Sequence, residues 1–236
     1  MDDLEGIIDK LYEDSIIKYE SKQERRTNIH VSDLTSECMR KPWYRLRDYN
    51  IPAKTFEKAL PLVHGTMLHE CVNLDGVEHE LQLAANVRTM MPVDYMTKPR
   101  KVDRYDCVQG SIDDIIEIDD EYIICDKKTT RQIPKEVPLN YQIQLNIYKL
   151  LYFVNYGLEV NKGAIIYIDK TSGWSKHKTL MFDLLESFTI RELVLDKLDE
   201  LKKENIPERV ESFLCNWCPF YDECKPNVFK RSNKSD

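Results

Sequence analysis

Two strand-like segments joined by a short acidic turn constrain the fold of this chain more than any other feature. Residues 110–130 read GSIDDIIEIDDEYIICDKKTT, and the two alternating runs in this stretch flank Asp119 and Asp120. Aspartate tolerates the backbone conformations of a tight turn, so the segment predicts a β-hairpin with these two residues at its tip. In that register Asp113 lies directly opposite Asp126 on the neighbouring strand.

The opposed carboxylates indicate a metal site. Directly opposed residues of an antiparallel pair hold their Cβ atoms about 4.5–5.5 Å apart, so Asp113 and Asp126 would repel each other without a cation between them. Oxygen donors of this kind suit Mg²⁺ or Mn²⁺. Because side chains alternate along a strand, Lys128 shares the face of Asp126, whereas Lys127 and Asp114 point to the opposite face. The hairpin therefore predicts a hydrolytic site; the alternative is a set of solvated charges on an exposed sheet face.

The segments around the hairpin alternate between helical and strand-like patterns. Strand-like alternation begins near residue 101, and a second strand pair follows the hairpin. Helices are expected at 4–20, 64–74, 140–157 and 182–204, and the second pair of strands at 163–169 and 177–183. This order indicates a mixed α/β core with helices on its flanks.

Charge and composition limit the class of protein. The chain has 236 residues with 34 basic and 41 acidic side chains, a formal net charge of −7. This length fits one domain with an appendage, and the acidic balance argues against a nucleic-acid binder that is basic overall. No apolar run approaches the roughly 18 residues of a membrane span, and the acidic N-terminus lacks the positive region of a signal peptide. We therefore expect a cytoplasmic protein without membrane contact.

Two further spacings place polar residues on predicted helices. Gln144 and Tyr148 lie four residues apart on one face of an otherwise apolar helix, as Q-x-x-x-Y. Gly65 and His69 form G-x-x-x-H, in which the glycine would let another backbone approach and the imidazole is a candidate metal ligand. Each pattern alone is equally compatible with a structural role.

The ordered series G-x-x-x-H, G-x-x-D, D-x-K-T and Q-x-x-x-Y resembles the RecB-type branch of the PD-(D/E)XK nucleases. The resemblance implies a restriction-endonuclease-like fold, with a mixed sheet flanked by helices, and a DNA-hydrolysing site that uses Mg²⁺ or Mn²⁺. It implies His69, Asp113 and Asp126 as metal ligands, Lys128 as a catalytic residue, and Gln144 and Tyr148 as residues that support the site or touch DNA. The second acid is Asp126 where many relatives have glutamate, and Ile112 stands where the superfamily's name has proline.

The C-terminal cysteines indicate a second, softer metal site. FLCNWCPFYDECKP holds Cys215, Cys218 and Cys224 at the spacing C-x2-C-x5-C, and most such sites close with a fourth ligand. Four earlier cysteines are candidates: Cys71, Cys107 and Cys125 lie in apolar segments, where cysteine behaves as a small hydrophobe, so Cys38 in its polar segment is the preferred choice. Spacing alone leaves both zinc and an iron–sulfur cluster open.

One early cysteine followed by this C-terminal array resembles the iron–sulfur members of the RecB-type branch. These include the CRISPR-associated exonucleases of the Cas-four type and the nuclease domains of AddB-like helicase–nucleases. The resemblance implies a [4Fe–4S] cluster, rather than zinc, on Cys38, Cys215, Cys218 and Cys224. The iron–sulfur module would then consist of about residues 30–48 together with 207–226, within a single RecB-like nuclease domain over 1–236. The compact length favours the CRISPR-associated type.

A basic and aromatic run is the candidate DNA-binding segment, since phosphate contacts depend on local rather than net charge. Residues 40–47, RKPWYRLR, contain no acid, and 98–104, KPRKVDR, add further basic groups. Cations interleaved with aromatic rings suit single-stranded DNA, whose bases stack while its phosphates pair. The predicted contacts are Arg40, Lys41, Trp43, Tyr44, Arg45 and Arg47.

These features together predict a metal-dependent DNA exonuclease that acts on single-stranded ends. The resemblance implies 5′-to-3′ polarity and, for CRISPR-associated members, trimming of DNA for spacer acquisition with the integrase complex as partner. One alternative is a repair or viral recombination nuclease of the same fold. Another is a non-catalytic iron–sulfur subunit that binds DNA ends within a larger complex.

Overall fold

A mixed β-sheet forms the centre of the molecule. The computed structural model describes residues 4–21, 28–47, 55–71, 77–95, 104–173 and 176–224, with the backbone alone described at 4–5, 21, 68–71 and 213–214. Within these ranges the sheet has seven strands in the order β3-β2-β4-β5-β6-β7, and β1 pairs with β4. The strands are β1 Ile29–His30, β2 Glu78–Asn86, β3 Met91–Pro92, β4 Cys107–Ile118, β5 Glu121–Thr130, β6 Lys162–Asp169 and β7 Lys176–Asp183.

The direction of the strands makes the sheet mixed. β1 runs parallel to β4 and β5 runs parallel to β6, whereas the other neighbours are antiparallel. A parallel pair needs a crossover connection, and between β5 and β6 that connection is helix α5, Leu139–Tyr156. The expected mixed sheet flanked by helices is thereby confirmed.

The acidic turn forms the predicted hairpin between β4 and β5. Asp119 and Asp120 have φ angles of 52° and 64°, the left-handed conformation that a two-residue turn of type I′ requires at both positions. The pairing runs from Ile118 and Glu121 beside the turn to Asp114 and Cys125. The predicted hairpin and its register are therefore confirmed.

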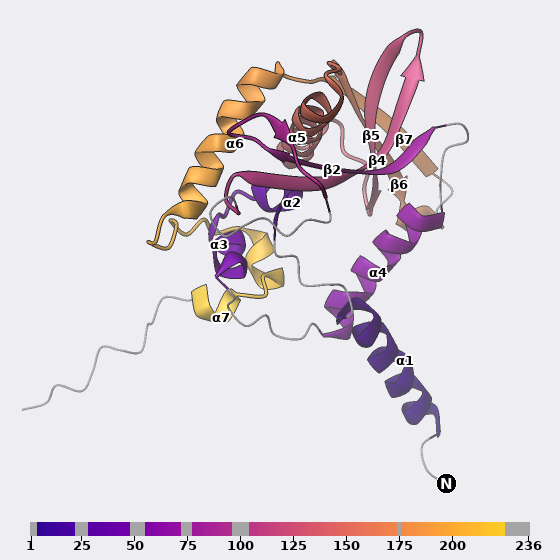
Figure 1. The fold of residues 1–236 in the computed structure, drawn as a ribbon. Coiled ribbons are helices and arrows are strands. Elements are labelled where there is room, and N and C mark those ends of the chain that lie inside the picture. Colours follow the sequence, from indigo (N-terminus) through magenta and orange to yellow (C-terminus); the bar gives the residue numbers. More distant parts are fainter. Residues whose placement is uncertain are drawn as a thin grey trace, which may run out of the picture.

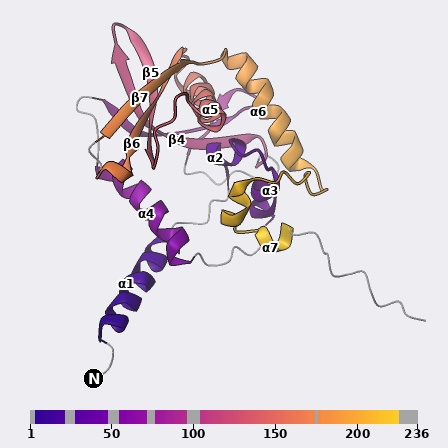
Figure 2. The same ribbon diagram turned by 180° about the vertical axis from the view of Figure 1, so that it is seen from behind.

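Helices cover the sheet and extend from it (Figures 1 and 2). The helices are α1 Leu4–Ser21, α2 Val31–Leu34, α3 Arg40–Leu46, α4 Phe56–Cys71, α5, α6 Ser187–Lys202 and α7 Tyr221–Cys224, with single 3₁₀ turns η1 at Lys170–Ser172 and η2 at Phe213–Trp217. Helix α5 lies across one face of the sheet and α6 packs beside it. Leu145, Leu150 and Leu151 of α5 are fully buried against this face, and Gly157 ends the helix with a φ of 71°.

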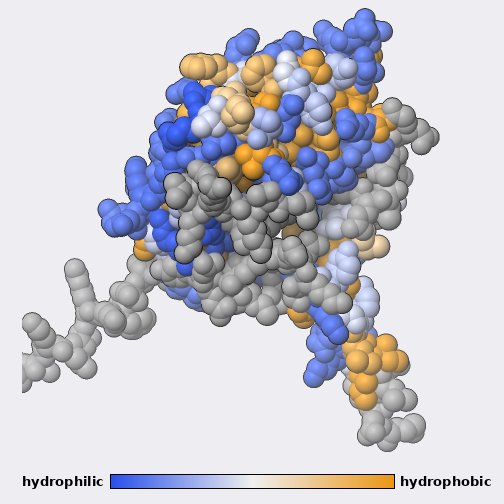
Figure 3. Space-filling model, in the orientation of Figure 1, coloured by the Kyte–Doolittle hydropathy of each residue, from blue (hydrophilic) through white to orange (hydrophobic). Residues whose placement is uncertain are grey.

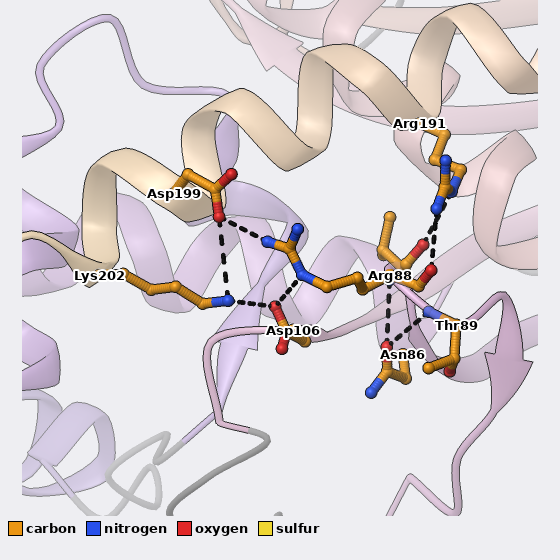
Figure 4. A network of polar contacts seen from close by, with 8 residues as sticks. Asn86, Arg88, Thr89, Asp106, Arg191, Asp199 and Lys202 are labelled. Atoms are coloured by element: carbon orange, nitrogen blue, oxygen red, sulfur yellow. Dashed lines mark hydrogen bonds and ion pairs between the residues drawn. The ribbon is translucent and has the colours of Figure 1, made fainter.

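A polar network ties α6 to the turn that follows β2 (Figure 4). Arg88 donates to Asp106 Oδ1 over 3.0 Å and to Asp199 Oδ1 over 2.5 Å, and Lys202 donates to Asp106 over 2.6 Å. Arg191 donates to the carbonyl oxygen of Arg88 over 2.8 Å. Three separate segments of the chain are joined at this point, so the network fixes the position of α6 against the sheet.

Helices α1 and α4 form an arm that projects from the sheet (Figures 1 and 2). Tyr12 of α1 packs edge-on against Phe56 of α4, with ring centroids 5.9 Å apart. Ile7, Ile8 and Leu11 remain exposed, and they contribute to the apolar surface along α1 in Figure 3. Within the described ranges, no helix combines the length and the apolar character needed to cross a membrane.

Candidate active site

The two carboxylates predicted to face each other lie at the point where β4 and β5 leave the hairpin ladder. Asp113 is 7% exposed and Asp126 is 1% exposed. Asp113 lies one residue beyond the last paired position of β4, and its Oδ2 accepts a hydrogen bond over 2.8 Å from the backbone N–H of Lys127. The side chain of Asp113 therefore bridges to β5 beside Asp126, and the structure brings the predicted pair together.

Lys128 completes this group from the same strand as Asp126. Its Nζ lies 2.5 Å from Asp126 Oδ2 and 5.3 Å from the centre of the Tyr141 ring. Burial would lower the pKa of Lys128, but the ion pair with Asp126 and the charge of Asp113 outweigh burial and raise that pKa above its ordinary value. The side chain is therefore an ammonium ion at neutral pH.

Helix α5 supplies the residues of the Q-x-x-x-Y pattern. Gln144 Nε2 donates to Asp126 Oδ1 over 3.0 Å and to the hydroxyl oxygen of Tyr148 over 3.2 Å. Residues four apart share one face of a helix, which explains why both side chains reach the site. Gln144 therefore contacts the second oxygen of Asp126 and holds that carboxylate in place.

Gly110 connects the G-x-x-D pattern to Tyr148. A Cβ atom at Gly110 would lie 2.6 Å from Tyr148 Cε1 and 2.7 Å from Val31 Cγ2, which is closer than real Cβ contacts. Only glycine therefore lets the Tyr148 ring pack onto β4, three residues before Asp113. Two motifs from distant parts of the sequence meet through this contact.

The opposite face of the hairpin carries a separate charged group. Lys127 Nζ lies 2.9 Å from Asp114 Oδ2, and His79 Nδ1 lies 2.5 Å from Asp114 Oδ1. Asp114 and Lys127 are buried there, as the alternation of side chains along a strand requires. The structure therefore separates Asp114 from Asp113 and Asp126. Asp106 is also separate, since it belongs to the α6 network in Figure 4.

Two tyrosines of the site carry no motif of their own. Tyr141, in the first turn of α5, lies with its ring centroid 6.4 Å from that of Tyr167 on β6. Tyr167 pairs with Lys128 in the parallel β5–β6 register, so both side chains share one sheet face. Burial, with the charges of Tyr141 and Asp126, raises the pKa of Tyr167 to about 12. A strand at 163–169 was expected, but its register against Lys128 is the signal that would have identified Tyr167.

The third predicted metal ligand falls in α4. His69 lies within the helix Phe56–Cys71, but its side chain is outside the described residues. A Cβ atom at Gly65 would have no described atom within 4 Å, so the expected close approach of another backbone to this glycine is wrong for the part of the chain that the structure describes.

Asp113 and Asp126 supply two carboxylates of the type that suits Mg²⁺ or Mn²⁺, so the donor chemistry fits the expected ion. Among the described residues, however, no three His, Cys, Asp or Glu side chains form a group that could hold a metal ion. A complete ligand set would therefore need a donor beyond this pair, and His69 remains the predicted one.

The predicted DNA-binding run forms helix α3, and its aromatic side chains are buried. Trp43 is 4% exposed and Tyr44 is 3% exposed. Trp43 Nε1 donates to the carbonyl oxygen of Lys203 over 3.0 Å, and the Tyr44 ring packs against Phe220 with centroids 5.3 Å apart. Neither ring presents a face to solvent, which contradicts the expectation that both stack on bases.

The arginines of α3 bind other parts of the protein. Arg45 Nη2 lies 2.5 Å from Asp33 Oδ2, and the Arg47 guanidinium lies 3.9 Å from the Trp43 ring centre. Arg40 Nε donates to the carbonyl oxygen of Pro207 over 2.7 Å. Lys41, by contrast, is exposed. The second basic run, 98–104, lies outside the described residues except for its last position.

The C-terminal cysteines lie beside this helix. Arg40 Nη1 lies 3.4 Å from Cys224 Sγ. Burial, together with the charges of Cys38 and Cys224, raises the pKa of the Cys218 thiol. The backbone N–H of Cys218 donates to the carbonyl oxygen of Cys215 over 3.1 Å. The structure therefore brings the early and late cysteines into one region, although their described thiols do not form a closed ligand group.

Comparison with known proteins identifies the family. The model of the PD-(D/E)XK nuclease superfamily matches residues 8–225. The crystal structure of SSO0001 is similar in fold: it is 20% identical, the match covers 94% of this chain and 97% of that chain, and the TM-score is 0.60. No curated protein matches the chain. Because the family model spans most of the sequence, this chain belongs to the PD-(D/E)XK nuclease superfamily.

Proposed function

We propose that this protein is a metal-dependent nuclease that hydrolyses DNA phosphodiester bonds at Asp113, Asp126 and Lys128. The observation that supports this most directly is the convergence of the three side chains on one face of β4 and β5, with Lys128 Nζ 2.5 Å from Asp126 Oδ2. Two buried carboxylates beside an ammonium ion are the groups that a hydrolytic site of this superfamily uses.

Each side chain has a distinct role in the proposed reaction. A bound divalent ion would polarise the phosphodiester and lower the pKa of a bound water. Asp113 and Asp126 would hold that ion. Lys128, charged at neutral pH, would orient the attacking water or stabilise the negative charge that develops on the phosphate. Gln144 keeps Asp126 in its orientation by donating to Oδ1.

We further propose that the enzyme is an exonuclease acting on single-stranded ends, and that Cys38, Cys215, Cys218 and Cys224 hold an iron–sulfur cluster. The position of Cys38 and Cys224 near Cys218, beside α3, supports the cluster. Thiolates are the ligands that such clusters require. The 5′-to-3′ polarity, the CRISPR-associated role with an integrase complex and the single nuclease domain over 1–236 remain predictions from the resemblance.

The nuclease proposal is tested with a matched set of carboxamide variants. End-labelled linear and circular single-stranded DNA are incubated with Mg²⁺ or Mn²⁺ and the wild type, Asp113→Asn, Lys128→Gln or Asp120→Asn. We expect Asp113→Asn and Lys128→Gln to lower the rate by roughly 10³-fold or more, because each removes a group that acts in the transition state. Asp120→Asn makes the same chemical change at the hairpin turn, where asparagine is well tolerated, and should cut normally.

Degradation of linear but not circular DNA would support an exonuclease. Equal cleavage of both would contradict the preference for ends while keeping the nuclease. Activity that survives both Asp113→Asn and Lys128→Gln would place the chemistry at another site. A wild type that binds DNA ends but never cleaves them would favour the non-catalytic subunit.

A further inference from the structure

Tyr167 lies next to the proposed site with a buried hydroxyl group. The side chain is 2% exposed, and β6 places it beside Lys128 of β5 on the same sheet face. Its ring lies 6.4 Å from that of Tyr141, and Lys128 Nζ lies 5.3 Å from the centre of the same Tyr141 ring. The three side chains therefore form one continuous surface that begins at Asp126.

The hydroxyl of Tyr167 has no hydrogen-bond partner among the described residues. A buried phenol normally finds such a partner, because an unsatisfied hydroxyl loses its bond to water on folding. The nearby fully buried groups of β5 and β6 are largely apolar, and Asp126 already accepts from Gln144 and pairs with Lys128. The missing acceptor must therefore come from something that binds the protein.

We propose that the Tyr167 hydroxyl donates a hydrogen bond to a non-bridging phosphate oxygen of the bound DNA strand. This inference rests on the proposed function, because it assumes that a phosphodiester binds beside Lys128. A phenol keeps its proton at neutral pH, so Tyr167 is a donor there, and the phosphate oxygen is the anionic acceptor that makes such a bond strong. No proton is transferred, and Tyr167 acts by binding the phosphate next to the lysine.

The test compares Tyr167→Phe with the wild type and with Tyr152→Phe. Phenylalanine removes only the hydroxyl. Tyr152 is a matched control because it is also a buried tyrosine on α5, but its ring packs against Tyr122 and Tyr156, away from Lys128. Three quantities are measured: the Tm without DNA, the steady-state rate on single-stranded DNA with Mn²⁺, and the affinity for a fluorescent single-stranded oligonucleotide in EDTA.

We expect Tyr167→Phe to keep or raise the Tm, since it removes an unsatisfied buried hydroxyl, and to weaken DNA affinity and kcat/KM roughly tenfold or more. Tyr152→Phe should match the wild type in affinity and rate. If the wild type binds DNA but does not cleave it, and Tyr167→Phe binds more weakly, the proposed hydrolysis is contradicted while the Tyr167 contact stands. Affinity and rate within twofold of the wild type, or a Tm lower by several degrees that reveals an internal partner, would overturn the proposal.

Discussion

At the scale of single residues, Asp126 has both of its carboxylate oxygens in contact with other side chains. Lys128 pairs with Oδ2 and Gln144 donates to Oδ1, so the carboxylate is held in one orientation before any substrate binds. This arrangement also sets the pH behaviour of Lys128. Its raised pKa means that the ion pair contributes stability below pH 10.5 and loses it as the pH rises through the raised value. Lys128 therefore keeps its charge across the neutral range.

The close packing of Tyr148 on Gly110 gives the first prediction. Gly110→Ala should lower the stability of the fold by about 1–3 kcal/mol and reduce nuclease activity, because the new methyl group displaces Tyr148 and, through it, Gln144. Thermal unfolding and the DNA cleavage rate measure both effects. Gly65→Ala is the matched control: with no described atom near its Cβ and a position inside α4, it should add about 0.5–1 kcal/mol. Equal stability of the two variants would contradict the packing argument.

The residues of the site could be predicted to different degrees. Asp113, Asp126 and Lys128 could be placed together because a turn signal and a period of two act over a short stretch of chain, and the structure confirms the resulting register. Tyr167 and the role of Gly110 could not, since each depends on contacts between segments that are far apart in the sequence. Such contacts arise only from the tertiary fold.

At the scale of elements, the same contrast separates α5 from α3. The helix at 140–157 was predicted from its own apolar periodicity and its terminal glycine, and both features appear in α5. The run RKPWYRLR was interpreted as a DNA-binding surface because cations alternate with aromatic rings. Its actual partners, the carbonyl oxygens of Leu201 and Lys203, come from the end of α6, and no local pattern indicates them. Strand β2 was also missed, because only the second half of its buried pattern is apolar.

The second prediction concerns α3. Arg45→Glu should lower the stability by about 2–3 kcal/mol, because it places a carboxylate against Asp33 in a mostly buried pair and removes the hydrogen bond to the carbonyl oxygen of Asn28. Lys41→Glu makes the same charge reversal at an exposed position of the same helix and should stay within about 0.5 kcal/mol of the wild type. Denaturant unfolding gives both values.

Single-stranded DNA binding by the same two variants separates folding from recognition. Weaker, salt-dependent binding by Lys41→Glu at unchanged stability would identify α3 as a DNA contact after all. If Arg45→Glu proves as stable as the wild type, the structural role assigned to Arg45 is wrong.

The third prediction concerns the network that holds α6. Burial alone would raise the pKa of Asp106, but hydrogen bonds from Lys202 and Arg88 outweigh it and hold that pKa below 3.8. A carboxylate with a lowered pKa stabilises the fold above its unfolded pKa and loses that contribution as the pH falls through the folded value. Asp106→Asn should therefore cost about 1 kcal/mol at pH 7, with the difference from the wild type shrinking below pH 3.8.

Urea unfolding across this pH range tests the Asp106 prediction. Asp196→Asn, an exposed substitution on α6, should match the wild type at every pH. A difference between Asp106→Asn and the wild type that persists unchanged in acid would show that packing rather than charge is responsible.

At the scale of the whole molecule, the net charge of −7 means that any grip on DNA must be local. Part of the acidic excess lies at the candidate metal site, where Asp113 and Asp126 face each other. The chain is also drawn together near its two ends: α3 binds the segment after α6 through Arg40 and Pro207, and Tyr44 packs on Phe220. A metal cluster at this junction would close a loop that contains nearly all of the nuclease core, which restricts the unfolded chain strongly.

The last prediction tests that junction. Protein purified without oxygen should show broad absorbance near ~400 nm, and Cys218→Ala should lose the absorbance and bound iron together with several degrees of Tm. Cys107→Ala removes a buried thiol from β4 instead and should keep both the colour and the iron. Iron and zinc content are measured on each variant beside thermal unfolding. A colourless wild type with one zinc that Cys218→Ala loses would replace the cluster with a zinc site. Equal metal content in all three proteins would remove the C-terminal cysteines from the ligand set, and the contacts of α3 alone would then have to hold the two ends of the chain together.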